Sequence, residues 1–211
     1  MSDVNPTVYI VDDDVAVLES LKLLVESAGW QAESFGSGRE FLSRRVQAPC
    51  CLILDLHLPD LNGLDVQKLV ANRSEMPVIF ITGHGDVATT VRAMQAGAIE
   101  FLTKPLRDDV LLHAIESALE RSHAEISLAA EMHDLRDCYA SLSHREQEVM
   151  TLVVSGRLNK QVGGTLGISE ITVKAHRGKM MRKMKAGSLP ELVMMAARLC
   201  VIPPFDRRRS M

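Results

Sequence analysis

Three short apolar runs constrain the fold more than any other feature of this chain. Residues 8–11, 52–54 and 78–81 consist only of aliphatic and aromatic residues. A strand with one solvated face alternates apolar and polar residues, whereas a strand covered on both faces is apolar throughout. The runs therefore predict buried strands of a parallel sheet.

Helical patterns separate these runs over the first 120 residues. We expect strands at residues 7–11, 31–35, 51–55, 77–82 and 100–103. Apolar residues three and four apart predict helices at 15–28, 38–45, 64–71 and 87–96, and a fifth helix from about residue 107. Five strands alternating with five helices predict a doubly wound α/β domain.

The fifth helix is expected to be unusually long. Apolar positions recur three or four apart from about Asp108 to Leu142, and no glycine or proline follows until Gly156. The pattern favours a helix that bridges two domains. A coiled-coil dimer seam is the alternative, which Ser122 and Ala129 disfavour because they are small.

The C-terminal part predicts a small all-α domain of four helices. Ser143 and Glu146 have the spacing of a capping box, and Ser188 with Glu191 repeats it. The helices are expected at 144–155, 159–166, 170–184 and 189–199. A short helix, a glycine turn and a longer helix form a helix-turn-helix, whose second helix enters the major groove of DNA.

Charge divides the chain in the same way. Residues 1–122 hold 10 basic and 18 acidic residues, 123–140 hold 1 and 4, and 141–211 hold 13 and 5. A basic C-terminal part indicates contact with nucleic acid. We expect domains at 1–121 and 141–200, a helical linker at 122–140 and a disordered tail at 201–211.

Composition argues against membranes and disulfides. No apolar run approaches 18 residues, and the strand pattern that begins at residue 7 leaves no room for a signal peptide. The four cysteines (Cys50, Cys51, Cys138 and Cys200) have no metal-site spacing, and two are adjacent. We expect free thiols and a cytoplasmic protein.

Five polar residues mark the strand ends. Asp12 and Asp13 follow the first predicted strand, Asp55 and Thr82 end the third and fourth, and Lys104 follows the fifth. The carboxyl ends of parallel strands meet at one edge of the sheet. Carboxylates there suit Mg²⁺ (or Mn²⁺), and a carboxylate can accept a phosphoryl group beside a cation. Any one of these residues could be merely structural, but together they favour a phosphoryl site. Asp14 is expected to cap a helix.

This part resembles the receiver domain of bacterial two-component response regulators. The resemblance covers about residues 7–119 and rests on Asp12-Asp13, Asp55, Pro59, Gly63, Thr82-Gly83, Gly97-Ala98 and residues 101–105. It implies a sheet of order 2-1-3-4-5 and a cis peptide bond before Pro105. It also implies that Asp55 is the phosphoacceptor and that Mg²⁺ is held by Asp12, Asp13, Asp55 and the main-chain carbonyl of His57.

The resemblance makes Thr82 and Phe101 a switch pair and Lys104 a ligand of the phosphoryl group. New phosphoryl oxygens on Asp55 would draw Thr82 inward and leave space for the Phe101 ring to bury. Helix 87–96, with Ala88 and Val91, could then become a dimer contact, or it could merely pack on the sheet.

The C-terminal part resembles the LuxR-type output domain of the NarL/FixJ regulators. The resemblance covers about residues 142–197 and rests on Leu142-Ser143, Arg145-Glu146, Glu148-Val149, Gly156, Asn159-Lys160, Leu166, Ile168-Ser169, Thr172-Val173-Lys174 and His176. It implies that Lys174 and Ala175 approach base edges and that Thr172, Arg177 and Lys179 hold phosphates. Asn159 and Lys160 are further backbone contacts, and Glu146 is a scaffold residue.

The helix at 170–184 has an expected division into faces. Ile171, Val173, Met180 and Met184 are expected to face the core, and Lys174, Ala175, Arg177 and Arg182 the outside. Two features depart from the family: Gly163-Gly164 lies inside a scaffold helix, and Gly178 occupies a position that often reads bases. Readout could therefore depend on Lys174, Arg177 and DNA shape.

The sequence thus predicts a phosphorylation-activated transcription regulator. A sensor histidine kinase, double-stranded promoter DNA, RNA polymerase and a second copy of the chain are the expected partners. Phosphorylation could act by dimerisation or by release of the DNA-reading helix. An aspartate-nucleophile phosphatase or phosphotransferase, or an adaptor that does not bind DNA, are the alternatives.

Overall fold

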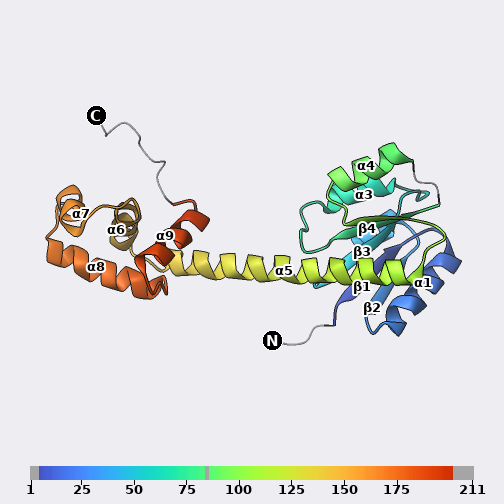
Figure 1. Ribbon diagram of the computed structural model, residues 1–211, viewed down its shortest axis with the longest axis horizontal. Coiled ribbons are helices and arrows are strands. Elements are labelled where there is room, and N and C mark those ends of the chain that lie inside the picture. Colours follow the sequence, from blue (N-terminus) through green and yellow to red (C-terminus); the bar gives the residue numbers. More distant parts are fainter. Residues whose placement is uncertain (1–4, 84–85, 202–211) are drawn as a thin grey trace. The chain divides into compact units, whose positions relative to one another are not determined.

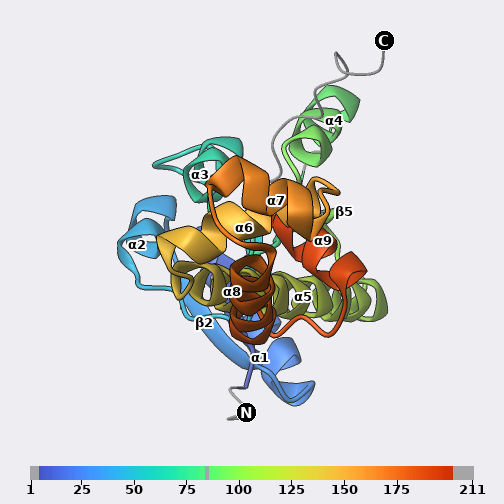
Figure 2. The same cartoon turned by 90° about the vertical axis from the view of Figure 1, so that its left-hand side faces the viewer.

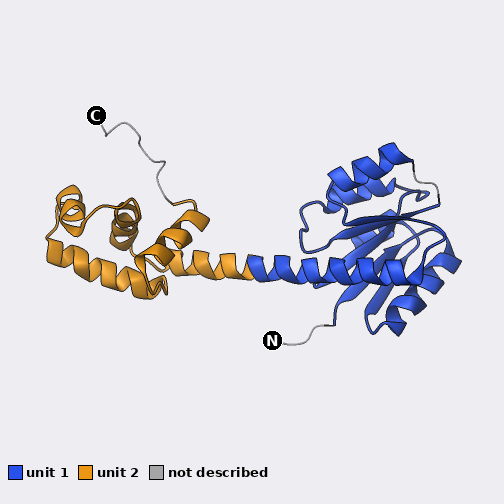
Figure 3. Cartoon of the chain, in the orientation of Figure 1, with its two compact units in different colours: residues 1–128 blue, residues 129–211 orange. Residues whose placement is uncertain are grey.

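A computed structural model of the chain describes residues 5–83 and 86–201. The chain forms two compact units, residues 1–128 and 129–211 (Figure 3). The division lies inside the segment 122–140 that the sequence predicts as a linker. The predicted tail lies outside the described residues, except for Val201.

The first unit contains the predicted parallel sheet. Its order is β2-β1-β3-β4-β5, and every neighbouring pair is parallel. The order confirms the expected doubly wound fold. The strands are β1 (Thr7–Val11), β2 (Gln31–Phe35), β3 (Cys50–Asp55), β4 (Val78–Thr82) and β5 (Glu100–Thr103).

Helices cover both faces of this sheet (Figure 1). They are α1 (Val15–Ser27), α2 (Gly38–Ser43), α3 (Gly63–Val70), α4 (Val87–Gln95) and α5 (Asp108–Ala140). Leu21 and Val25 of α1 and Ile115 of α5 pack on one face. Phe41 of α2 and Val66 of α3 lie in the cluster on the other face. All residues of β1, β3 and β4 are buried, which explains their continuous apolar runs.

The predicted long helix is confirmed, because α5 spans 33 residues without interruption. Its first part belongs to the first unit. Near its other end, Leu135 is buried in the core of the second unit, against which Met132 and Tyr139 also pack. Part of the predicted linker therefore contributes to that core.

One buried hydroxyl anchors α5 to the first unit. Ser122 is completely buried, donates a hydrogen bond to the carbonyl of Glu75 at 2.5 Å and accepts one from the amide of Cys50 at 3.0 Å. The sequence marked Ser122 only as a weak position in a coiled-coil seam. Its partners lie 47 and 72 residues away, so no local pattern could reveal this role.

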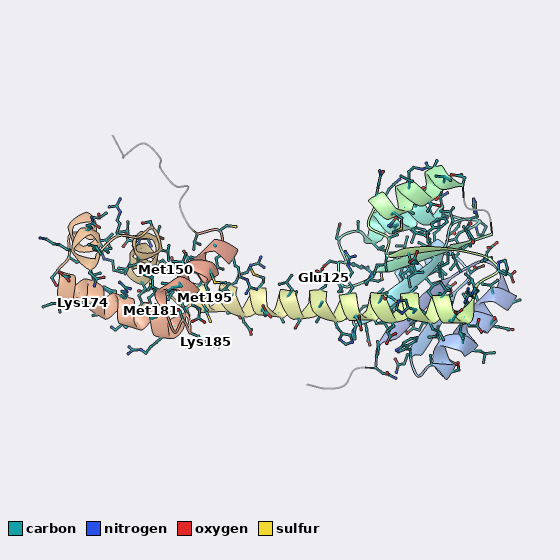
Figure 4. All side chains as sticks on the ribbon, viewed as in Figure 1. Glu125, Met150, Lys174, Met181, Lys185 and Met195 are labelled. Atoms are coloured by element: carbon teal, nitrogen blue, oxygen red, sulfur yellow. The ribbon has the colours of Figure 1, made fainter. Side chains whose placement is uncertain are left out.

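The second unit contains the four predicted helices. They are α6 (His144–Val154), α7 (Asn159–Leu166), α8 (Glu170–Lys183) and α9 (Leu189–Arg198). Figures 1 and 2 show α8 along one side of this unit, with α6 and α7 on its other side. Met150, Met181 and Met195 meet between α6, α8 and α9 in one apolar core (Figure 4).

The capping box of α6 is present and supports α8. Ser143 accepts from the amide of Glu146, and the Glu146 carboxylate accepts from the amide of Ser143. Lys183 donates to the same carboxylate at 2.7 Å. The hydrogen bond from Lys183 and that from the Ser143 backbone lower the pKa of Glu146. Glu146 is therefore the scaffold residue that the sequence predicts.

The two glycines of α7 have different surroundings. A Cβ atom on Gly163 would lie 2.7 Å from the carbonyl oxygen of Ile168, whereas one on Gly164 would meet nothing within 4 Å. The carbonyl of Gly163 accepts from the amides of Gly167 and Ile168. The backbone of the turn at Ile168 thus packs directly against Gly163, where a side chain would not fit. This packing explains why residue 163 is glycine, but it does not explain the glycine at residue 164.

One prediction about α8 is wrong. The sequence predicts Ile171 on the core face, but its side chain is 80 % exposed, while Val173 is fully buried. Residues two apart on an α-helix lie about 200° apart around its axis, so these two side chains cannot share a face.

The four cysteines are free thiols, as predicted. Burial raises the pKa of Cys50 to about 12 and that of Cys51 further still. Among residues 5–83 and 86–201, no helix is both long enough and apolar enough to cross a membrane.

Candidate phosphoryl site and nucleic-acid interface

The sheet gathers the polar residues at its carboxyl edge. Asp12 follows β1, Asp55 and Thr82 end β3 and β4, and all three are buried. Lys104 follows β5, and its peptide bond to Pro105 is cis, as expected. Residues more than 90 positions apart in the chain therefore meet at one site.

Lys104 connects the two buried carboxylates. Its ammonium lies 2.6 Å from Asp12 Oδ2 and 3.3 Å from Asp55 Oδ1. Burial lowers the pKa of Lys104, but the hydrogen bond to Asp12 and the charge of Asp55 outweigh burial, so the net shift is upward. Burial raises the pKa of Asp12, against the opposing effect of Lys104. The site concentrates negative charge around one cation.

Close backbone packing fixes the Asp55 carboxylate. Its Oδ2 atom accepts a hydrogen bond from the amide of His57 at 2.8 Å. Gly63 donates to the carbonyl of Leu56, and a Cβ atom on Gly63 would approach the backbone of Asp55 to 2.5 Å. Only glycine allows the loop after β3 to close so tightly behind Asp55.

Asp13 and Asp14 differ from Asp12. Both side chains are exposed. Asp14 caps α1 by accepting from the amide of Ala16, as predicted, and its own amide donates to Asp12 Oδ1 at 2.9 Å. The acidic triplet thus divides into one buried carboxylate, one exposed carboxylate and one helix cap.

The predicted switch residues lie on neighbouring strands. Thr82 Oγ1 lies 3.4 Å from His57 Nδ1, close to the phosphoacceptor candidate. Phe101 is half-buried, and its ring centroid lies 6.1 Å from that of Phe80 in an inclined arrangement. The Phe101 ring therefore packs against the core cluster that includes Val66 of α3 and Ala93 of α4.

The acidic residues suit a magnesium ion that keeps part of its water. The described residues include no cluster of three acidic, histidine or cysteine side chains arranged for a metal. Two carboxylates do meet, those of Asp12 and Asp55, through Lys104. Mg²⁺ is commonly bound by one or two carboxylates with water and phosphate oxygens, so this pair fits it.

An apolar stripe lies on the surface of α4. Val87, Val91 and Met94 are 81 %, 46 % and 41 % exposed and lie four and three residues apart. Ala88 beside them is also exposed. The residues of α4 that are buried are Thr89 and Ala93, so the stripe is a separate, exposed surface of the helix.

The outward face of α8 carries much of the predicted nucleic-acid contact. On this face Lys174, Ala175, Gly178, Lys179 and Arg182 are exposed, as is Ile171. Figure 4 shows Lys174 near the start of α8 and Lys185 just beyond its end. Lys174 forms an exposed ion pair with Glu170 at 3.4 Å. A cationic helix face of this kind suits the phosphates of a duplex.

Three predicted contact residues have partners within the unit. Arg177 is half-buried and donates to Asn159 Oδ1 at 3.2 Å, which joins α8 to the start of α7. Thr172 is half-buried and lies 2.8 Å from the Ser169 hydroxyl. Lys160 is exposed.

Two protein families match the two parts of the chain. Residues 8–116 match the response regulator receiver domain, and residues 140–196 match the bacterial regulatory proteins of the luxR family. The matched segments contain the candidate phosphoryl site and the helix-turn-helix, respectively.

Full-length relatives share this organisation. The response regulator protein TmoT of Ectopseudomonas mendocina is 47 % identical over 201 residues, which covers 94 % of this chain and 91 % of TmoT. The transcriptional regulatory protein FixJ of Azorhizobium caulinodans is 40 % identical over 201 residues, which covers 94 % of this chain and 95 % of FixJ. The solved structure of the response regulator StyR is 42 % identical, covers 92 % of this chain and 99 % of StyR, and has a TM-score of 0.82.

Proposed function

The chain belongs to the two-component response regulators that combine a receiver domain with a LuxR-type DNA-binding domain, and we propose that phosphorylation of Asp55 controls its binding to promoter DNA. Members of this family are transcription regulators rather than enzymes, which removes the phosphatase alternative. The observation that carries the proposal is the meeting of Asp12, Asp55 and Lys104 at the carboxyl edge of the sheet.

The residues around Asp55 can each assist acceptance of a phosphoryl group. One Asp55 oxygen is already held by the His57 amide, which leaves the other beside Lys104. Asp12, Asp13, Asp55 and the His57 carbonyl would hold Mg²⁺, which neutralises the crowded oxygens. Lys104 would move away from Asp12, and its ammonium group would then contact the added phosphoryl group. Thr82 would donate its hydroxyl to the same group.

A sensor histidine kinase is the proposed donor of the phosphoryl group. A cavity of about 330 Å³ lies between α1 and residues 104–111 and includes Lys104. Its wall is largely apolar, with Val17, Leu21, Leu24, Pro105, Leu106 and Leu111. A helix of the kinase that docks here would bring a phosphohistidine to the edge of the sheet where Asp55 lies.

Dimerisation is the mode of activation that the surface supports best. The apolar stripe of α4 is exposed in the single chain, and α4 itself packs beside β5, which carries Phe101. Burial of the Phe101 ring would reshape this surface when Thr82 moves. Two receiver units joined at α4, through Ala88 and Val91 among others, would place two helix-turn-helix units on paired half-sites.

The proposal is tested by DNA binding of the full-length chain with acetyl phosphate and Mg²⁺. Duplexes selected from a random library should bind more tightly after phosphorylation, and Asp55→Asn should remove this gain. Equal affinity of the phosphorylated and unphosphorylated chain would contradict the proposal.

Two lysines distinguish base contacts from phosphate contacts. We expect Lys174→Ala to weaken binding to a selected duplex about 10-fold more than binding to random DNA, because a lysine on a guanine edge contributes about 1–3 kcal/mol. Lys160→Ala should weaken both equally. Equal losses for Lys174→Ala would make it a phosphate contact.

A further inference from the structure

An apolar stripe runs along the exposed side of α8. Ile171, Ala175 and Gly178 lie four and three residues apart, and all three are exposed. Ile171 is 80 % exposed. The exposed residues of the stretch 171–178 are these three and Lys174. Of the four, Lys174 is the one whose side chain can donate a hydrogen bond.

Packing within the unit does not account for an isoleucine at position 171. Val173 and Met180 fill the core beneath α8, on the opposite side from Ile171. Folding buries little of the Ile171 side chain, so its apolar surface stays available to a bound partner. Ile171 is therefore an apolar contact available to whatever covers this face of α8.

The major groove offers one apolar group on its base edges. Thymine carries a C5-methyl group there, whereas the other groups that the bases present are hydrogen-bond donors and acceptors. By the helical period the exposed Lys174 and Lys179 lie on either side of the stripe and the exposed Arg182 continues it, so positive charge is available for phosphates on both sides of the groove.

We propose that Ile171 is a specificity-determining residue that packs on the methyl group of a thymine in each bound half-site. The proposal rests on entry of α8 into the major groove, as proposed above. Gly178 supports it, because a Cβ atom there would meet nothing within 4 Å and its absence lets base edges approach the helix closely. The stripe would then recognise the shape of the groove and the thymine methyl groups. A longer polar side chain at these positions would instead form hydrogen bonds with the base edges.

Replacement of thymine by uracil tests the proposal, because uracil lacks only the methyl group. The full-length chain is treated with acetyl phosphate and Mg²⁺, and a duplex is selected from a random library. Each thymine of this duplex is then replaced singly by uracil, and affinity is measured by fluorescence anisotropy. We expect one thymine in each half-site at which the replacement weakens binding about fourfold, the value for one buried methyl group.

The variant Ile171→Ala assigns this methyl dependence to its side chain. We expect the variant to bind the thymine duplex less tightly than the wild type and to show no further loss with uracil at the same position. Met194→Ala, which removes an exposed apolar side chain from α9, is the matched control and should keep the fourfold dependence.

Three outcomes separate the inferences. Loss of the methyl dependence only in Ile171→Ala supports the proposal. The same uracil penalty in Ile171→Ala, or no penalty at any thymine in the wild type, overturns it while DNA binding stands. Failure to select any duplex overturns it together with the proposed DNA binding.

Discussion

Adjacent alanine substitutions in α7 should change the stability of the second unit in opposite directions. A Cβ atom on Gly163 would lie 2.7 Å from the Ile168 carbonyl oxygen, a distance that real Cβ contacts do not reach, so the turn must move. Overpacking of this kind costs about 1–3 kcal/mol. The movement also strains the hydrogen bonds that the Gly163 carbonyl accepts from Gly167 and Ile168.

Gly164 provides the matched control. It lies in the same helix, and a Cβ atom there has open space. Alanine is favoured over glycine in a helix by about 1 kcal/mol, so Gly164→Ala should raise the free energy of unfolding by that amount. Gly163→Ala receives the same helical gain but loses more to the contact with Ile168, and the two variants should differ by about 1–3 kcal/mol.

Urea denaturation of the full-length chain followed by two signals measures this difference. Far-ultraviolet circular dichroism reports helices of both units. The fluorescence of Trp30, the single tryptophan, reports the first unit, where its ring packs against the α1 and α5 core. The Trp30 transition should be the same in both variants. Equal stabilisation by the two alanines would refute the reasoning about Gly163.

Further predictions concern two buried polar groups. Ser122→Ala should lower the free energy of unfolding of the first unit by about 2–3 kcal/mol, because it leaves the Cys50 amide and the Glu75 carbonyl without their partner; a Trp30-detected loss no larger than that of the exposed Ser127→Ala would contradict this. Glu146→Gln should destabilise the second unit by about 1–2 kcal/mol at neutral pH. Since the folded pKa of Glu146 lies below its usual 4.5, the wild-type advantage should be complete above pH 4.5 and disappear as the pH falls further, and an advantage that does not change with pH would contradict the role of its charge.

The sequence predicted the elements well where one physical signal dominated. Continuous apolar runs identified β1, β3 and β4, and the serine caps identified the starts of α6, α8 and α9. Because the carboxyl ends of parallel strands lie at one edge of a sheet, the predicted strand ends also placed Asp12, Asp55 and Lys104 together.

Other features depended on contacts that sequence spacing does not record. The role of Ser122 comes from partners in distant segments. The requirement for Gly163 comes from a turn that folds back to it, rather than from helix propensity. The error at Ile171 has a different cause, because its apolar character favours a core position while the helical period, which the sequence does record, directs it away from Val173.

Phosphorylation of Asp55 is the central claim, and intact-mass measurement tests it most directly. The full-length chain incubated with acetyl phosphate and Mg²⁺ should gain the mass of one phosphoryl group, and fragmentation should place that group on Asp55. Asp55→Asn should gain none, and chelation of Mg²⁺ should prevent the gain in the wild type. Equal labelling of the variant, or a phosphoryl group on another residue, would contradict the account.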